Sequence, residues 1–249
     1  VFNTNLIGTF NILKKCINDK ANIIFLSSSR VYSIEKLRAM VKNLNIRTPL
    51  KIGKKITEKF ETESAISLYG FTKLASEKLI KEFFFKQNLK YIINRFAVIA
   101  GPWQFGKQDQ GFIPLWVARH LYKKSLSFIG FGGHGNQIRD VIHIKDVCEI
   151  IYLQIKNLRK VNNNIFNIGG GSSNAISLRD LTYKCQRLTK NKIKIKRVKN
   201  TSIYDVPYFV TDNSKVFKFY KWKPSINIDN ILYDIYKWLK ENKSLKEYF

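Results

Sequence analysis

The sequence has 249 residues, which is enough for one large α/β domain or two small ones. Its hydrophobic content of 45% and aromatic content of 14% fit a packed core and exclude a disordered chain, and no apolar run approaches the roughly 20 residues of a membrane span. The formal net charge of +26 would suit a nucleic-acid or membrane-surface protein, but the lysines are scattered among abundant asparagine and isoleucine, so we expect neither partner.

Helical and extended patterns alternate along the chain. In the first hundred residues, they predict a helix over 4–18, a strand over 23–26, a polar excursion over 30–66 with some helix near 34–43, a helix over 67–87 and a strand over 91–99. Next come a helix over 113–121, strands over 125–131 and 139–144 around a glycine turn, and a helix over 146–158. The last predicted elements are a strand over 165–168, a helix over 178–189, a strand over 192–198 and a helix over 228–242. The first strand is a continuous apolar run, so we expect it to be buried on both faces. The alternation predicts an α/β fold with a parallel sheet covered by helices on both faces.

The three cysteines, Cys16, Cys148 and Cys185, are odd in number and widely spaced. This pattern argues against a disulfide framework and against a zinc site. We therefore expect no metal and a reducing, cytoplasmic location. The chain begins with Val1 rather than with methionine, and we expect it to be a fragment or a processed form.

Two glycine-rich segments are candidates for contact with a ligand. Residues 130–135 satisfy G-x-G-x-x-G, but a β-like run follows them where a dinucleotide fingerprint needs a helix. We interpret this segment as a turn. Residues 169–171 follow a strand and precede a helix start, and we favour close backbone packing over ligand contact there. We find no dinucleotide fingerprint in the sequence.

Tyr69 and Lys73 are four residues apart, which is about one helical turn, so the phenol and the ammonium share a helix face. A nearby ammonium stabilises a phenolate, and a phenol stabilised in this way can act as acid and base near neutral pH. The same spacing also occurs as a chance surface pair on an amphipathic helix. The spacing alone leaves both interpretations open.

Several segments together resemble the extended short-chain dehydrogenase/reductase family of nucleotide-sugar enzymes. They are residues 5–13 (NLIGTFNIL), 27–32 (SSSRVY), 64–77 with the Tyr-x-x-x-Lys helix, 139–146 (RDVIHIKD) and 167–169 (NIG). Narrower features resemble the CDP-paratose 2-epimerase (CDP-tyvelose epimerase) branch of that family. They are residues 67–77 (SLYGFTKLASE), 99–104 (IAGPWQ), 106–111 (GKQDQG), 129–133 (IGFGG), 205–207 (DVP) and the long excursion after Tyr32.

The resemblance implies a Rossmann-type doubly wound parallel sheet with a smaller C-terminal substrate-binding lobe. It assigns residues 1–105 to the C-terminal part of the NAD-binding domain, with the catalytic residues. It assigns residues 106–249 mainly to the substrate lobe, with about 139–170 returning to the Rossmann sheet. The family's first βαβ units and glycine fingerprint would precede Val1, so we expect the chain as given to bind NAD poorly.

The resemblance also implies NAD as the cofactor and Ser28, Tyr69 and Lys73 as the catalytic residues. Tyr69 would take the proton of the sugar hydroxyl, and Lys73 would hold the nicotinamide ribose. Ser28 would hydrogen-bond the reacting hydroxyl, although Ser27 or Ser29 are alternatives because side chains alternate along a strand. The cofactor would also contact Ala97 and Val98.

For the substrate, the resemblance implies Arg139 at the pyrophosphate, where a planar guanidinium suits bidentate contact. A salt bridge from Arg139 to Asp140 or Asp146 is the alternative. Other implied substrate contacts are Ser29, Asp109, Gln110, Phe128 or Phe131, and Asp205. We interpret His143 as a core histidine rather than a catalyst.

Two positions distinguish this chain within the family. Related 4,6-dehydratases carry Asp-Glu where this chain has Ser29 and Arg30, so the resemblance disfavours dehydration. The family commonly has a phosphate-binding arginine where Ser202 stands, and its loss would weaken phosphate binding by about 1.5–3 kcal/mol.

The sequence therefore predicts an NAD-dependent epimerase of a CDP-sugar, in the synthesis of surface-polysaccharide (lipopolysaccharide) precursors. The alternatives are another sugar-nucleotide epimerase or reductase and an inactive, basic binding protein with the same fold. By resemblance we expect a homodimer or higher homo-oligomer that pairs through the helices containing residues 5–18 and 67–87.

Overall fold

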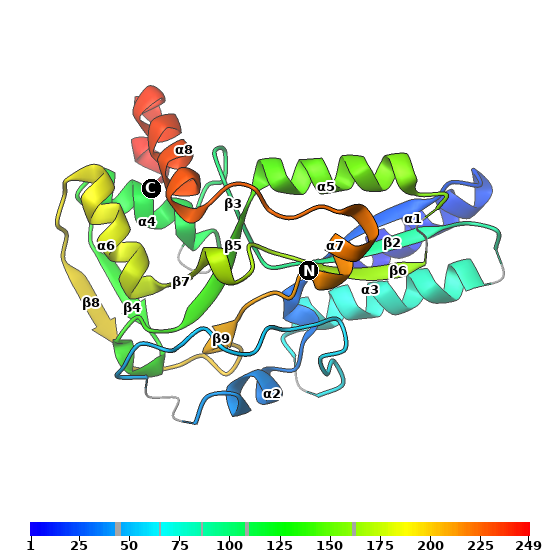
Figure 1. Ribbon diagram of the computed structural model, residues 1–249, viewed down its shortest axis with the longest axis horizontal. Helices are drawn as coiled ribbons and strands as arrows, with labels where there is room; N and C mark the ends of the chain where they lie inside the picture. The colour runs from blue at the N-terminus through cyan, green and yellow to red at the C-terminus, as the bar shows by residue number, and fades with distance from the viewer. Residues whose placement is uncertain (43–45, 65, 86, 108–109, 161–162) are drawn as a thin grey trace.

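The computed structural model describes residues 1–42, 46–64, 66–85, 87–107, 110–160 and 163–249. Figure 1 shows a sheet flanked by long helices at one end of the molecule and a second group of strands and helices at the other. The predicted α/β class with parallel strands is confirmed.

The first sheet is parallel and has the strand order β1-β2-β6. Its strands are β1 (Ile23–Ser28), β2 (Tyr91–Phe96) and β6 (Asn164–Ile168). The flanking helices are α1 (Gly8–Asn18), which continues a π-helical turn at Asn3–Ile7, α3 (Leu68–Phe85) and α5 (Ile144–Asn157). Helices α1 and α3 pack on one face of this sheet and α5 packs on the other.

Alternation along β2 explains this layering, because successive side chains of a strand point to opposite faces. Ile92 joins the cluster that contains Val147 and Ile150 of α5. Ile93 joins the cluster that contains Leu13 of α1 and Ile80 of α3. Both isoleucines are fully buried, so the middle strand is covered on both faces.

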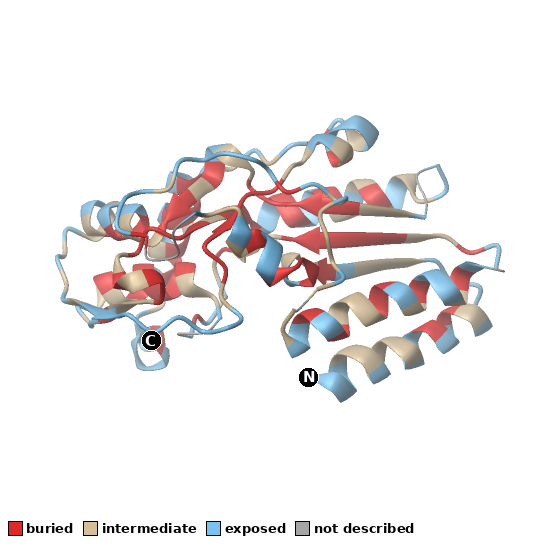
Figure 2. Ribbon diagram, turned by 90° about the horizontal axis from the view of Figure 1, so that it is seen from below, coloured by how far each residue is buried: buried red, intermediate tan, exposed pale blue. Residues whose placement is uncertain are grey.

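The second group of elements begins where the chain leaves β2. Its strands are β3 (Val98–Ala100), β5 (Ile138–His143), β7 (Ala175–Ser177) and β9 (Tyr208–Phe209), with β4 (Leu126–Ile129) and β8 (Ile195–Val198) in a separate parallel pair. Helices α4 (Phe112–Leu121), α6 (Leu178–Thr189) and α8 (Ile228–Glu241) share one apolar core. Two shorter helices, α2 (Ile34–Ala39) and α7 (Ser214–Tyr220), lie against loops and strand ends. Figure 2 shows the buried residues running through both groups.

The expectation for the first strand was wrong. Residues 23–25 are half-buried and the Leu26 side chain is 47% exposed. The reason is position: in the part of the chain that the structure describes, β1 pairs only with β2 and therefore forms an edge of its sheet. The glycine segment at residues 130–135 is a turn, as predicted, with a 3₁₀ turn over Phe131–Gly133.

A buried ion pair joins α3 to the sheet. The carboxylate of Glu77 accepts from Arg95 Nη2 at 2.6 Å and from Arg95 Nε at 3.0 and 3.2 Å. The two side chains are 1% and 6% exposed. Ser27 on β1 donates to the same carboxylate at 2.6 Å, and Arg95 Nη1 donates to the Tyr32 hydroxyl at 3.2 Å. One carboxylate therefore connects α3 with both β1 and β2.

No helix in the described ranges is both long and apolar enough to pass through a lipid bilayer.

We predict that Glu77→Gln lowers the free energy of unfolding by about 3–5 kcal/mol, because it leaves the Arg95 guanidinium buried without a counter-charge. Urea unfolding measures this change. Asp19→Asn is the matched control, since it breaks an ion pair with Lys15 in which both side chains are largely exposed, and we expect a much smaller effect. Equal effects of the two substitutions would contradict the prediction.

Candidate functional site

Ser28 ends β1 and begins the next turn. It is the N-cap of a 3₁₀ turn over Ser29–Val31, and its Oγ accepts from the backbone N–H of Arg30 at 3.1 Å. The cap fixes where the strand stops, and the half-buried hydroxyl stays at the carboxyl end of the sheet. In open α/β sheets this edge is where ligands bind.

Tyr69 and Lys73 lie in the first two turns of α3, at the same edge of the sheet. The Lys73 ammonium donates to the carbonyl of Leu26 at 2.9 Å and lies 5.0 Å from the centre of the Phe25 ring. Burial lowers the pKa of Lys73 from its ordinary value. The Tyr69 side chain is 40% exposed. The Lys73 side chain is therefore held by a hydrogen bond, and the exposed Tyr69 side chain is accessible to a ligand.

The start of α3 makes close backbone contact with the turn after Ser28. A Cβ on Gly70 would clash with the carbonyl oxygen of Arg30, so only glycine permits this approach. Ser28 and Tyr69 thus belong to two segments in direct contact. No hydrogen bond joins the Tyr69 hydroxyl to Ser28 or Lys73 among the residues that the structure describes, as is common before substrate binds.

Ala97 and Val98 lie where the chain passes from the first sheet to the second. The Ala97 N–H donates to the carbonyl of Ile168 at 2.9 Å, and Val98 begins β3 opposite Val141. Their backbone is therefore held by strands on both sides, next to the carboxyl end of β2. Their contact with a cofactor remains a prediction.

An ion pair joins Arg139 to Asp205, which is not one of the two partners that the sequence analysis offered. Arg139 Nη2 donates to Asp205 Oδ1 at 3.1 Å and to the carbonyl of Val206, and Nη1 donates to its neighbour Ile138 at 2.8 Å. The pKa of Arg139 is lowered to about 10, mainly by burial and also by the nearby Arg30, while Asp205 opposes both effects. The partner of Arg139 is Asp205, not Asp140 or Asp146.

The remaining candidate substrate residues lie apart from one another. Ser29 is half-buried within the turn after Ser28, while Gln110 is exposed and its carbonyl accepts from the Lys107 N–H at 2.6 Å. The Phe128 ring stacks on Trp116 of α4, with ring centres 6.5 Å apart. Asp109 lies outside the described residues. The roles given to these residues stay predictions.

His143 is fully buried at the end of β5. Its Nδ1 accepts from the Lys145 N–H at 3.1 Å, so it caps α5. Its Nε2 lies 3.5 Å from Asp234 Oδ2, and burial lowers the pKa of the ring. This arrangement is that of a core histidine, which the sequence predicted.

Asp140 is a buried carboxyl group that the sequence analysis did not assign to the site. Its Oδ2 accepts from the Gly171 N–H at 2.9 Å, and burial raises its pKa from 3.8 to about 6. A Cβ on Gly169 would clash with this carboxyl group, and one on Gly170 would clash with the Val141 carbonyl. Close packing thus explains Gly169 and Gly170, as predicted, whereas Gly171 has a positive φ of 66° that favours glycine.

The environment of Lys73 fits a nicotinamide cofactor. An ammonium has three donors, and in the described part of the chain that of Lys73 has one hydrogen-bond acceptor, the carbonyl of Leu26. Donors thus remain for the hydroxyls of a nicotinamide ribose beside Tyr69. The exposed apolar side chain of Leu26 lies on the same strand.

A serine at a strand end, a Tyr-x-x-x-Lys helix in contact with it and a parallel sheet define a Rossmann-type enzyme of the short-chain dehydrogenase/reductase class. Residues 1–169 match the model of the NAD dependent epimerase/dehydratase family. The chain belongs to this family, whose cofactor is NAD.

Two relatives are named as sugar-nucleotide epimerases. The chain is 26% identical over 244 residues to CDP-paratose 2-epimerase of Salmonella typhi, covering 95% of this chain and 71% of that protein. It is also 26% identical over 249 residues to UDP-glucuronate 4-epimerase 2 of Arabidopsis thaliana, covering 94% of this chain and 52% of that protein. The chain thus spans about half the length of the plant relative.

Solved structures show the same fold. UDP-glucose 4-epimerase of Thermotoga maritima, solved with UDP-glucose, aligns with a TM-score of 0.79 at 22% identity, over 97% of this chain and 71% of that one. UDP-glucose 4-epimerase of Thermus thermophilus, solved with NAD, aligns with a TM-score of 0.77 at 18% identity, over 96% and 70%. The Rossmann-type fold predicted from the sequence is confirmed.

We predict that Asp140→Asn changes how stability depends on pH. The folded-state pKa of Asp140 is raised, so between about pH 4 and pH 6 the folded protein binds more protons than the unfolded chain, and this carboxyl group destabilises the fold progressively as pH rises. The unfolding free energy of wild type minus that of the variant should therefore fall by up to about 3 kcal/mol between pH 4 and pH 7. Urea unfolding at both pH values measures it. The exposed Asp229→Asn serves as control, and a pH-independent difference for Asp140→Asn would refute the prediction.

Proposed function

We propose that this chain carries the catalytic residues of an NAD-dependent nucleotide-sugar epimerase, and that its substrate is a CDP-sugar epimerised at C2, as in the conversion of CDP-paratose to CDP-tyvelose. The observation that carries the proposal is the position of Lys73. Its half-buried ammonium is bonded to the strand that ends in Ser28, and it shares a helix face with the exposed Tyr69.

The reaction needs a base for one sugar hydroxyl and a group that orients that hydroxyl. Tyr69 takes the hydroxyl proton as a phenolate and returns it later as a phenol. Ser28 donates to or accepts from the same hydroxyl, because its Oγ lies at the strand end and Tyr69 lies on the helix in contact with it. Lys73 stabilises the phenolate electrostatically and binds ribose hydroxyls.

Bound NAD, with its ribose held by Lys73, would supply the acceptor and donor of the hydride at the sugar carbon. Overall oxidation state is unchanged, so the reaction needs no external oxidant. Epimerisation follows if the oxidised sugar turns its other face before hydrogen returns. The protein's part is to hold the hydroxyl, move its proton and leave the sugar room to turn.

The turn after Ser28 favours epimerisation over dehydration. Water loss from a sugar needs an acid and a base beside the reacting carbons. The turn Ser29–Val31 offers a hydroxyl and a guanidinium there, and it contains no carboxylate.

The CDP-sugar assignment is the finer part of the proposal. Its support is the set of branch-like segments, such as 99–104 and 106–111, together with the similarity to CDP-paratose 2-epimerase. Equal identity to a UDP-glucuronate 4-epimerase makes a UDP-sugar the second candidate. The enzyme would act in the cytoplasm on precursors of surface polysaccharide.

We predict that Tyr69→Phe lowers kcat by about two to four orders of magnitude, because it removes the proton-transfer group and keeps the ring. Product analysis with NAD and a panel of CDP-, UDP- and GDP-sugars measures turnover and identifies the substrate. Tyr183→Phe is the matched control, since this exposed tyrosine lies on α6. Undiminished turnover by Tyr69→Phe would sink the mechanism, and turnover of UDP-sugars alone would replace the CDP assignment.

We also propose that two copies of the chain pair through α1 and α3. The support is the apolar surface of these helices and the turn before α1, where Ile7, Ile12, Leu68 and Phe71 are 44–61% exposed. Removal of such surface from water favours association.

We predict that Ile12→Glu reduces the mass measured by light scattering from that of a dimer to that of a monomer. The matched control is Tyr152→Glu on α5, which changes a side chain of similar exposure outside the proposed interface. A wild-type protein that is monomeric at micromolar concentration would contradict the pairing.

A further inference from the structure

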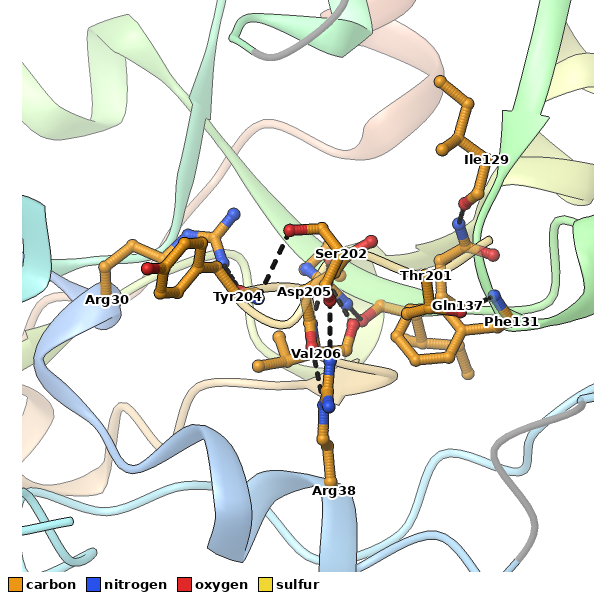
Figure 3. Close-up of polar contacts among 12 residues, drawn as sticks. Arg30, Arg38, Ile129, Phe131, Gln137, Thr201, Ser202, Tyr204, Asp205 and Val206 are labelled. Atoms are coloured by element: carbon orange, nitrogen blue, oxygen red, sulfur yellow. Dashed lines mark hydrogen bonds and ion pairs between the residues drawn. The ribbon is translucent and has the colours of Figure 1, made fainter. Parts of the chain in front are cut away.

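Three arginines from different elements converge on the loop over residues 202–206. Figure 3 shows two of them, Arg30 and Arg38, reaching the loop from different sides. Arg30 follows Ser28 in the turn after β1, Arg38 lies on α2, and Arg139 lies on β5. Within the described ranges, the one carboxylate that any of them contacts in an ion pair is that of Asp205. This part of the molecule therefore carries two positive charges more than its bonded carboxylate can balance.

Two of the three guanidiniums make two hydrogen bonds each to the loop. Arg38 donates through Nη2 to the carbonyl of Ser202 at 2.7 Å and through Nε to the carbonyl of Asp205 at 3.0 Å. Arg139 is bonded to the Asp205 carboxylate and to two backbone carbonyls, and its side chain is only 15% exposed. Both hold the loop in place and are positioning residues.

Arg30 differs from these two in its exposure and its bonding. It is exposed, and its guanidinium donates through Nη1 to the carbonyl of Tyr204 at 3.0 Å. A guanidinium has five N–H donors, and a single neutral acceptor leaves most of them for a ligand. Arg30 is also close enough to Arg139 to lower its pKa, so an anion placed between them would relieve repulsion.

The backbone of Arg30 is fixed within the candidate site. Its N–H donates to the Oγ of Ser28, and its carbonyl packs against Gly70, the neighbour of Tyr69. The side chain then reaches across to the loop at Tyr204, 174 residues away in the sequence. The backbone of Arg30 therefore lies next to Ser28 and to the start of α3, and its guanidinium extends from there to the loop at Tyr204.

We propose that Arg30 binds an anionic group of the substrate, so that it is a substrate-binding residue of the same site as Ser28 and Tyr69. This inference rests on the proposed nucleotide-sugar substrate. A planar guanidinium binds phosphate or carboxylate oxygens through two parallel hydrogen bonds. The anion is either the diphosphate of the nucleotide or a carboxylate on the sugar.

The test is Arg30→Met in the full chain, which keeps the length of the side chain and removes its charge. We expect KM to rise about 10- to 100-fold, with a smaller change in kcat, because the lost contact is made in the ground state as well. Arg30→Lys should recover part of the loss, since it restores the charge without the planar fork. Arg187→Met, which removes an exposed charge from α6, is the matched control and should leave KM unchanged.

Calorimetry with CDP, cytidine, UDP-glucose and UDP-glucuronate separates the two anions and does not depend on turnover. Weaker binding of CDP, with cytidine unaffected, identifies the diphosphate. Weaker binding of UDP-glucuronate alone identifies a sugar carboxylate. Unchanged affinity for all three anionic ligands in Arg30→Met, at an unchanged melting temperature, overturns the inference. A wild-type protein that binds NAD, and binds CDP through Arg30, but turns over no sugar overturns the proposed function instead.

Discussion

The position of the candidate site depends on one buried ion pair, Glu77 with Arg95. Burial of two charges costs several kcal/mol, and this cost is offset only when hydrogen bonds satisfy both groups. Here the carboxylate also accepts from Ser27, and the guanidinium also donates to Tyr32. What the pair provides is placement: it fixes the middle of α3 against β1 and β2. Lys73 lies one turn before Glu77 on the same helix, so the helix face that carries Tyr69 and Lys73 is aligned with the strand end that carries Ser28.

Local sequence patterns predicted most of the helices and strands, because the spacing of apolar residues reflects which side chains are buried. In the helices and strands of the first sheet, such as α3 and β2, apolar residues recur at the spacing expected for the faces that are buried. The patterns could not reveal α7, β7 or β9. These are short, and β7 and β9 form by pairing with β5, which is distant in sequence. The error at β1 has a related cause, since an apolar run does not tell a central strand from an edge strand.

The candidate site also contains some residues that local patterns indicate and others that they do not. Ser28, Tyr69 and Lys73 could be predicted as candidates because a strand end and one helical turn are local features, and the family resemblance supplied the roles predicted for them. Arg38 was not identifiable, because its bonds go to backbone carbonyls 164 and 167 residues away. The pairing of Arg139 with Asp205 also joins residues 66 apart. Such contacts depend on how segments distant in the sequence pack together, which no local spacing encodes.

The net charge of +26 is informative only near the loop over residues 202–206, where Arg30, Arg38 and Arg139 converge. Scattered surface lysines are screened within about 8 Å at physiological salt, so their sum says little about any one site. Arg30 and Arg139 are close enough that one lowers the pKa of the other, and Asp205 balances only one of them. The local excess also bears on Ser202, where related enzymes commonly have arginine. A fourth guanidinium, at position 202, would add repulsion where three already converge. The neutral Ser202 is therefore compatible with the proposal that Arg30, in the turn after Ser28, binds the anionic group of the substrate.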